Sequence, residues 1–383
     1  MKGIKIIGTI VCFLLFTSTG YAKEMAFGSV PVKIGGFLST YANITDKQTP
    51  YLRFANATDE ADFGKEVVLG LQFDATLSDE ISLVTQLVGD QYLDDFSVNV
   101  DWAFLRYAIN DDIYFRMGKM GLPAFLYSEY LNVRYAYTWV RVPSEVYEMM
   151  PLSAYTGVDL LIRIPVGDYT VNLQPYMGNA SLTSPFGFAG EVTTELDGLI
   201  GIAATFETDM QTFRLGYLEG EVSMTDPTLL INLNAVIGPI PGVPISSLIN
   251  GVPLTFTSLS YALNYDAWEF IAEWSERTAA TTLVSTFHGN FISVAYQVDD
   301  YKPYLTWARV DTRNASTKPQ EQESFSLGLR IELSGGTALK MEVQRADIDT
   351  AGGNRGLFAL SATLGAEDIS SVTLFSIGFD TVF

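Results

Sequence analysis

S-V-T-L-F-S-I-G-F-D-T-V-F, residues 371–383, ends the chain on an alternating pattern of side chains. One face carries mostly large apolar residues and the other small or polar ones: Phe375, Ile377, Phe379, Thr381 and Phe383 against Ser376, Gly378 and Asp380. A soluble protein seldom ends its last strand on an exposed aromatic residue, whereas a barrel in a bilayer must turn one face of every strand toward lipid. The terminus therefore predicts the closing strand of a transmembrane antiparallel β-barrel.

The same alternation recurs over most of the chain. Between Lys65 and Leu77, apolar residues occupy the odd positions and polar or small residues occupy most even ones. Such a run is about the 9–11 residues that a tilted strand needs to cross a bilayer. The pattern predicts 16 strands, at residues 32–41, 65–77, 81–89, 98–109, 112–119, 157–165, 169–177, 199–207, 211–220, 254–265, 267–277, 287–298, 301–311, 323–333, 337–346 and 371–383.

The connections between these strands alternate in length. Short acidic or glycine-rich turns, such as 78–80 and 334–336, are followed by longer stretches, such as 90–97, 120–156 and 178–198. A meander barrel gives this alternation when one rim is plain and the other carries function. The mature chain is therefore predicted to form a single all-β domain with short periplasmic turns and long extracellular loops. A barrel of 16–18 strands encloses an aqueous channel, so the lumen is predicted to be wet unless a loop obstructs it.

Composition excludes several classes of protein. The chain has 44 acidic and 23 basic residues, a net charge of -21, which excludes nucleic-acid binding because phosphate contacts need a basic face. It is 48% apolar and 13% aromatic but only 17% charged. No apolar run of the mature chain is long enough for a spanning helix. A barrel explains this combination, because its apolar residues are spread over every second position.

Residues 1–22 have the pattern of a cleaved secretory signal peptide. Lys2 and Lys5 precede an apolar run, and Gly20-Tyr21-Ala22 fits a cleavage site. A retained membrane anchor is the alternative interpretation. Cys12 is the single cysteine and lies in this segment, so the predicted mature domain, 23–383, is expected to hold no disulfide.

The stretch 120–156 is long and aromatic for an exposed loop. It contains six tyrosines and only five charged residues. A long connection of this composition is expected to pack against something and not to extend into solvent. It is therefore the candidate obstruction of the lumen.

Two short patterns resemble the Gram-negative porin family. R-M-G-K at 116–119 resembles the end of the fifth strand in many porins, with Lys119 in place of Arg. Y-A-Y-T-W-V-R-V-P-S-E-V-Y at 135–147 is similar to a DcaP-like branch, and the terminal Phe383 resembles the ending of outer-membrane proteins. The resemblance implies 16-stranded barrels that associate as homotrimers in the bacterial outer membrane, in contact with membrane lipid and lipopolysaccharide. It also implies that 120–156 folds into the lumen as the constriction.

Charged residues near this loop are the candidate pore lining. They are Glu129, Arg134, Arg141, Glu145 and Glu148 on the loop, with Lys119, Asp159, Arg163 and Arg330 on the wall. Cations facing carboxylates across a gap produce a transverse field that sorts ions. Strand phase places the last three wall residues inward, whereas Lys119 follows from the resemblance. In the alternative interpretation, the loop is a structural plug whose charges pair with one another.

The expected function is passive diffusion of ions and small hydrophilic solutes, with a preference for carboxylate-bearing solutes as a finer expectation. The alternative is a barrel with a closed lumen whose loops bind or adhere. Catalysis is not expected, because His288 is the only histidine and its neighbours Ser285 and Asn290 do not form a recognisable triad. No cofactor and no metal site is expected.

Overall fold

The computed structural model describes residues 23–52, 55–92, 95–185, 191–224, 249–279, 286–313, 321–350, 356–358 and 369–383. The predicted signal peptide and Ser285 lie outside the described residues. The elements are β1 (Lys23–Phe27), β2 (Val30–Thr45), β3 (Asp62–Thr76), β4 (Ile81–Tyr92), β5 (Asp95–Asn110), β6 (Ile113–Gly121), η1 (Ser128–Tyr130), η2 (Arg134–Ala136), α1 (Ser144–Tyr147), β7 (Ala154–Val166), β8 (Tyr169–Pro185), β9 (Glu191–Glu207), β10 (Gln211–Met224), β11 (Val252–Tyr265), β12 (Trp268–Ala279), β13 (Thr286–Tyr296), β14 (Tyr301–Arg313), β15 (Gln322–Ser334), β16 (Thr337–Ile348) and β17 (Ser371–Val382). None of the described helices is both long and apolar enough to span a membrane.

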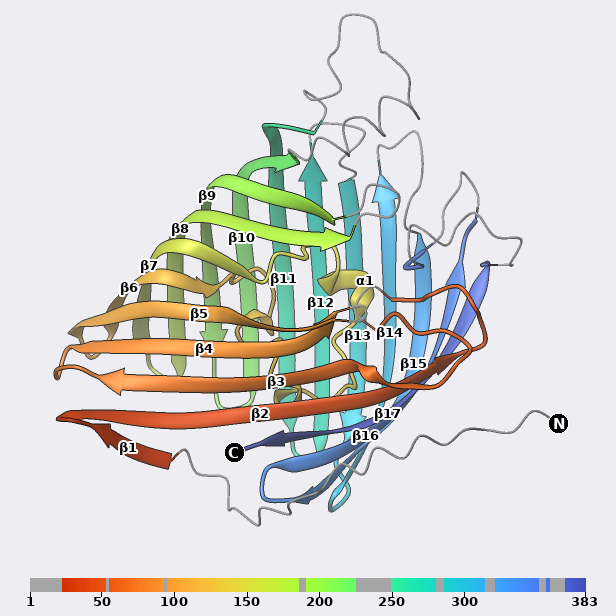
Figure 1. Ribbon diagram of the computed structural model, residues 1–383, viewed down its shortest axis with the longest axis horizontal. Helices are drawn as coiled ribbons and strands as arrows, with labels where there is room; N and C mark the ends of the chain where they lie inside the picture. The colour runs from red at the N-terminus through yellow and green to blue at the C-terminus, as the bar shows by residue number, and fades with distance from the viewer. Residues whose placement is uncertain are drawn as a thin grey trace, which may run out of the picture.

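The strands form one antiparallel sheet that closes on itself (Figure 1). Strands β2 to β17 each pair with the next, and β17 pairs with β2 to complete a 16-stranded barrel within the described residues. At the seam, the backbone N–H groups of Gly36 and Phe383 donate to each other's carbonyls at 2.8 and 2.9 Å. The predicted strand count and the predicted closing role of the C-terminal strand are both confirmed.

Strand β1 was not predicted from the sequence. It pairs with the first residues of β2, from Val30 to Ile34, on the same edge that β17 occupies farther along. Its five residues, K-E-M-A-F, are too few for alternation to be recognised.

The outer face of the barrel is apolar, as alternation predicts. Along the closing strand, Phe375 and Ile377 are 49% and 47% exposed, whereas Leu374 and Ser376, which alternate with them, are buried. Neighbouring strands repeat the pattern, with Leu327 on β15 and Leu305 on β14 exposed and in register. Because lipid cannot hydrogen bond to side chains, every strand presents apolar groups on this face.

Two predicted loops are largely strand. The segments 90–97 and 178–198 were expected to be long connections, but β4 continues to Tyr92, β8 continues to Pro185 and β9 begins at Glu191. Ladder pairing between β8 and β9 extends to Pro185 and Glu191. In β8 and β9, pairing continues toward the long-loop rim beyond the last exposed apolar pair, Met177 and Ile200.

Candidate functional site

The segment between β6 and β7 folds into the barrel and spans its lumen. Its regular structure is limited to η1, η2 and the single turn α1, which lies against the inner wall at β12, β13 and β14 (Figure 1). Asn132 Nδ2 donates to Asp101 on β5 at 3.0 Å. Tyr147 Oη donates to Glu273 on β12 at 3.1 Å. Because β5 and β12 lie seven strands apart in a 16-stranded sheet, this segment, residues 122–153, reaches across the barrel. We call it the lumen loop.

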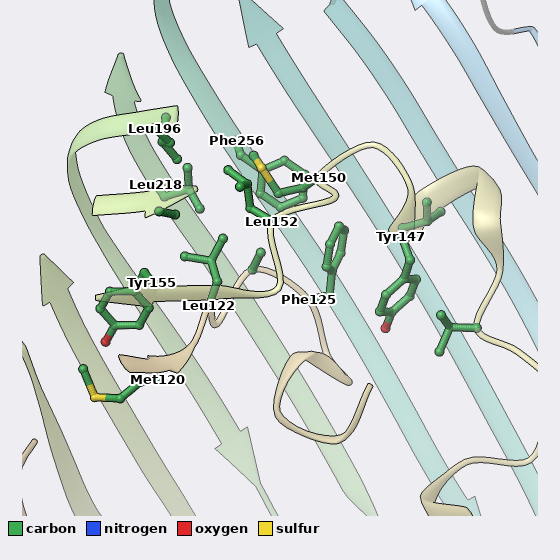
Figure 2. Close-up of a cluster of buried hydrophobic side chains, with 14 of the residues drawn as sticks. Met120, Leu122, Phe125, Tyr147, Met150, Leu152, Tyr155, Leu196, Leu218 and Phe256 are labelled. Carbon is green, nitrogen blue, oxygen red and sulfur yellow. The ribbon is translucent and has the colours of Figure 1, made fainter. Parts of the chain in front are cut away.

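The two ends of the lumen loop are fixed by an apolar cluster. Figure 2 shows loop side chains packed against those of β9, β10 and β11: Leu122, Phe125, Met150 and Leu152 near Leu196, Leu218 and Phe256. The Phe125 and Tyr147 rings stack at 4.5 Å between centroids. Aromatic residues therefore serve here as a core inside the barrel, which explains why the loop is so rich in them.

Cations of the wall hold the backbone of the lumen loop. Lys340 Nζ on β16 donates to the carbonyls of Arg134, Tyr137 and Trp139 at 2.7, 2.7 and 2.8 Å. Arg330 Nη1 on β15 donates to the carbonyls of Tyr135 and Tyr137 at 2.7 and 2.8 Å. An irregular buried segment has carbonyls that no helix or ladder satisfies, so they need partners from elsewhere. The wall side chains supply these partners.

Two more wall cations act in the same way at the loop ends. Arg214 Nη2 on β10 donates to the carbonyl of Pro123 at 3.2 Å. Arg277 Nη1 on β12 donates to the carbonyl of Met149 at 2.6 Å. We call Arg214, Arg277, Arg330 and Lys340 the wall clamp. Its members sit on four different strands, so the loop is held along most of its length.

Arg134 and Arg141, the predicted loop cations, both pair with Glu66 on β3. The Arg134 Nη1–Glu66 Oε1 distance is 2.6 Å, and the Arg141 Nη2–Glu66 Oε2 distance is 2.8 Å. Burial lowers the pKa of each guanidinium, but the neighbouring Glu66 carboxylate outweighs it and raises both pKa values above the usual range. Both arginines are therefore charged at physiological pH. Their guanidinium groups point toward Glu66 on the wall and not toward the centre of the lumen.

The loop carboxylates have separate environments. Glu129 is partly exposed, and its Oε1 lies 3.9 Å from Arg116 Nη2 on β6. Glu145 is fully buried in α1 and accepts a hydrogen bond from Gln322 Nε2 on β15 at 2.7 Å. Glu148 ends α1 and is half-buried. These three carboxylates lie in different parts of the loop and do not form one acidic row opposite the arginines.

The four predicted wall residues also separate into different places. Asp159 is buried inside the barrel and pairs with Arg116, whose Nε donates to Oδ1 at 2.9 Å. Arg330 belongs to the wall clamp, as described above. Arg163 is exposed near the short-turn rim, where its N–H donates to the Asp112 carbonyl. Lys119 Nζ donates to the Val100 carbonyl of the neighbouring strand β5 at 2.6 Å. Arg116, which pairs with Asp159, is itself buried and faces inward.

Sequence reasoning missed three buried charges of the wall, two of which contact the loop while the third pairs with one of them. Glu66, Lys340 and Asp380 are each less than 5% exposed, and Lys340 Nζ lies 2.9 Å from Asp380 Oδ2. The sequence did offer one signal for these residues. Each is a charged residue at an inward position of a strand, and such a residue faces the lumen. Which of these charges would meet loop backbone depended on the path of the loop, which alternation does not report.

The inner wall under the lumen loop is packed. Ile271, Phe291 and Tyr304 face inward from β12, β13 and β14, pack in one cluster with loop residues, and are each 2% exposed or less. The loop therefore obstructs the lumen at this level. The sequence predicted a water-filled lumen only if no loop did so. The charges of the loop pair mainly with the wall, and not with one another as the plug interpretation held.

Solved structures of outer-membrane proteins have the same fold. The channel DcaP of Acinetobacter baumannii aligns with a TM-score of 0.59 at 10% identity, over 95% of this chain and 100% of that chain. An anion-selective porin from Comamonas acidovorans gives 0.57 at 13% identity, over 92% and 100%. OmpT of Vibrio cholerae gives 0.57 at 13% identity, over 94% and 100%. No protein-family model and no curated protein matches the sequence. The chain thus shares the closed 16-stranded barrel of porin structures.

Proposed function

We propose that the protein is an outer-membrane channel of the porin type, through which ions and small hydrophilic solutes diffuse. The observation that carries the proposal is a closed 16-stranded barrel with an apolar outer face and a folded loop held inside it. A barrel of this size encloses a lumen wide enough for water, and a loop fixed at one depth restricts passage there. The porin-like solved structures support the same function.

Localisation and assembly follow from the same argument. The exposed apolar face supports insertion in a bilayer in contact with membrane lipid and lipopolysaccharide. The predicted signal peptide supports export to the outer membrane. OmpT of Vibrio cholerae is described in a trimer form, and we propose a homotrimer for this chain too. Chemical cross-linking of detergent-extracted protein tests this assembly: a three-subunit band is expected, and a single-subunit band alone contradicts it.

A preference for carboxylate-bearing solutes remains the finer part of the proposal. Arg134 and Arg141 are the loop cations that would contact a carboxylate, and their shared contact with Glu66 leaves them less available to a passing anion. The assignment of 135–147 to a DcaP-like branch likewise remains a prediction.

The position of the filter can be tested at the two arginines. If they contribute to the field in the pore, Arg134→Gln and Arg141→Gln will shift the reversal potential in a salt gradient toward cations. A matched change at Arg163→Gln, on the exposed rim, should shift it less. Unchanged conductance and reversal potential in both loop variants would remove these residues from the filter.

The second candidate is a barrel with a closed lumen whose outer loops bind a partner. The burial of inward side chains beneath the lumen loop favours it. Conductance in planar bilayers separates the two functions, because a closed barrel gives no current steps even when it is fully folded.

A further inference from the structure

Inward-facing polar side chains form two short rows on the wall from β11 to β16, and the two rows are offset along the strands because Ser275 pairs with Gly289 and Ser293 pairs with Ile271. Ser258 and Ser275 are cross-strand neighbours on β11 and β12. A second row runs across β13, β14, β15 and β16 through Ser293, Thr306, Ser326 and Gln344. All six residues are 7% exposed or less. We call these six residues the hydroxyl strip, because five of them carry a hydroxyl group.

The lumen loop lies directly over the hydroxyl strip. Ser258 Oγ donates to the carbonyl of Ala124 at 2.6 Å, and Trp139 Nε1 donates to Ser293 Oγ at 2.8 Å. Farther along the wall, a small recess is lined by Trp139 of the loop and by Thr306, Ser326 and Gln344 of β14 to β16. The strip therefore lies beside polar space as well as loop atoms.

Part of the strip is polar without being paired. Among the described residues, Ser275 Oγ and Gln344 Oε1 are buried and have no hydrogen-bond partner. Burying such atoms unpaired is unfavourable, and a permanently dry core would be more stable with alanine or valine there. The cost of these polar side chains is offset if water can hydrogen bond to them in another state of the barrel.

Glycines mark where the loop backbone touches the wall. A Cβ atom built on Gly289 would lie 2.7 Å from the Glu145 carbonyl oxygen and 2.8 Å from Met149 Cε. One built on Gly216 would lie 3.1 Å from the Ala124 carbonyl oxygen. Since Glu145 belongs to α1, a side chain at Gly289 could be accommodated only if the loop moved away from β13.

We propose that the hydroxyl strip is the solute path of an open state, in which the lumen loop detaches from β11 to β16. Water and small solutes that hydrogen bond to hydroxyl and amide groups would then pass along the strip. The inference rests on the proposed channel function and adds to it the wall that solutes touch. The wall clamp and the apolar cluster hold the loop in the covered state seen here.

The test uses cysteines as reporters of access. In a full-length Cys12→Ser background, which has no cysteine left, Ser275→Cys and Ser326→Cys are placed singly on the strip. The probe is a trimethylammonium-ethyl methanethiosulfonate reagent, applied to folded protein in detergent and during bilayer recording. If the open state is a minor one, both cysteines will react about 10- to 1,000-fold more slowly than an exposed Arg163→Cys control. Modification of an open channel should also lower its conductance.

Two further variants make the result specific. Gly289→Ala should raise the modification rate at Ser275→Cys by about tenfold, because it shifts the population toward the detached loop. Gly35→Ala is its matched control, since a Cβ there meets only the Phe383 carbonyl at 3.5 Å. Ala346→Cys is equally buried but packs in a separate cluster with Tyr51 and Phe358. It should stay unreactive if the loop alone moves.

The outcomes separate the inference from the proposed function. If wild-type protein conducts but the strip cysteines never react, the strip is not the path, and the channel proposal stands. If no folded preparation conducts, the channel proposal fails and the inference fails with it. Equal reactivity at Ala346→Cys would also overturn the inference, because it would show general unfolding in place of loop detachment.

Discussion

The two faces of the barrel wall obey different rules. On β15, the outward Leu327 is 64% exposed and needs only to be apolar, whereas the inward Arg330 is 8% exposed and donates to two particular carbonyls. Lipid is a uniform solvent, so many side chains serve equally well on the outer face. The lumen loop is one specific partner, so each inward residue has its own requirement.

This comparison teaches that cations inside a barrel do not by themselves make a charged pore. Arg330 and Lys340 have strand phases that suggest pore lining, yet both hold loop backbone. The buried charges of Arg330 and Lys340 are tolerated because carbonyls and carboxylates replace lost hydration contacts.

The largest expected effect is on the inner face. Lys340→Met removes three hydrogen bonds to the loop and leaves Asp380 without its cation, which should lower the free energy of unfolding by about 3–5 kcal/mol. Urea-induced unfolding from lipid vesicles measures it. The double variant Lys340→Met/Asp380→Asn should recover part of the loss. A single variant within about 0.5 kcal/mol of wild type would show that the clamp does not hold the loop.

A charge on the outer face should have the next largest effect. Leu327→Arg places a cation near the middle of a lipid-facing strand, at an expected cost of about 2–4 kcal/mol in the same vesicle assay. Leu327→Phe is the control and should be nearly neutral, because the requirement is only for an apolar side chain. Equal losses in both variants would mean that the outer face also needs specific packing.

A single loop contact should matter less. Ser258→Ala removes the hydrogen bond to the Ala124 carbonyl and should reduce the free energy of unfolding by about 1 kcal/mol. Ser275→Ala removes a hydroxyl with no partner among the described residues and should be neutral or stabilising. The reverse order of the two effects would contradict the assignment of Ser258 as a loop anchor.

The smallest effect is expected at the outer rim. Arg309 pairs with Asp311 at 2.7 Å, but its side chain is 49% exposed. Arg309→Gln should change stability by less than about 0.5 kcal/mol, because solvent screens such pairs. A loss comparable to that of Lys340→Met would break the distinction between the two faces.

Much of the fold was predictable from alternation. Phe375 and Ile377 point outward because lipid selects them, and the predicted seam between Phe383 and the first barrel strand is present at Gly36. Alternation fails where lipid is absent, so the outer parts of β8 and β9 were missed, and β1 was missed because its five residues are too few to show a pattern. For the site, strand phase placed Asp159 and Arg330 inward. It did not indicate that Glu66 would pair with both loop arginines, because that contact depends on the path of the loop between distant strands.

Single-channel recording in planar bilayers tests the central claim most directly. Purified, folded wild-type protein should insert with discrete, ohmic conductance steps, and Gly289→Ala should lengthen or increase the open level relative to Gly35→Ala. Protein that is demonstrably folded as a barrel yet gives no steps, in wild type and in Gly289→Ala alike, would contradict a porin-type channel and favour a closed barrel that binds through its loops.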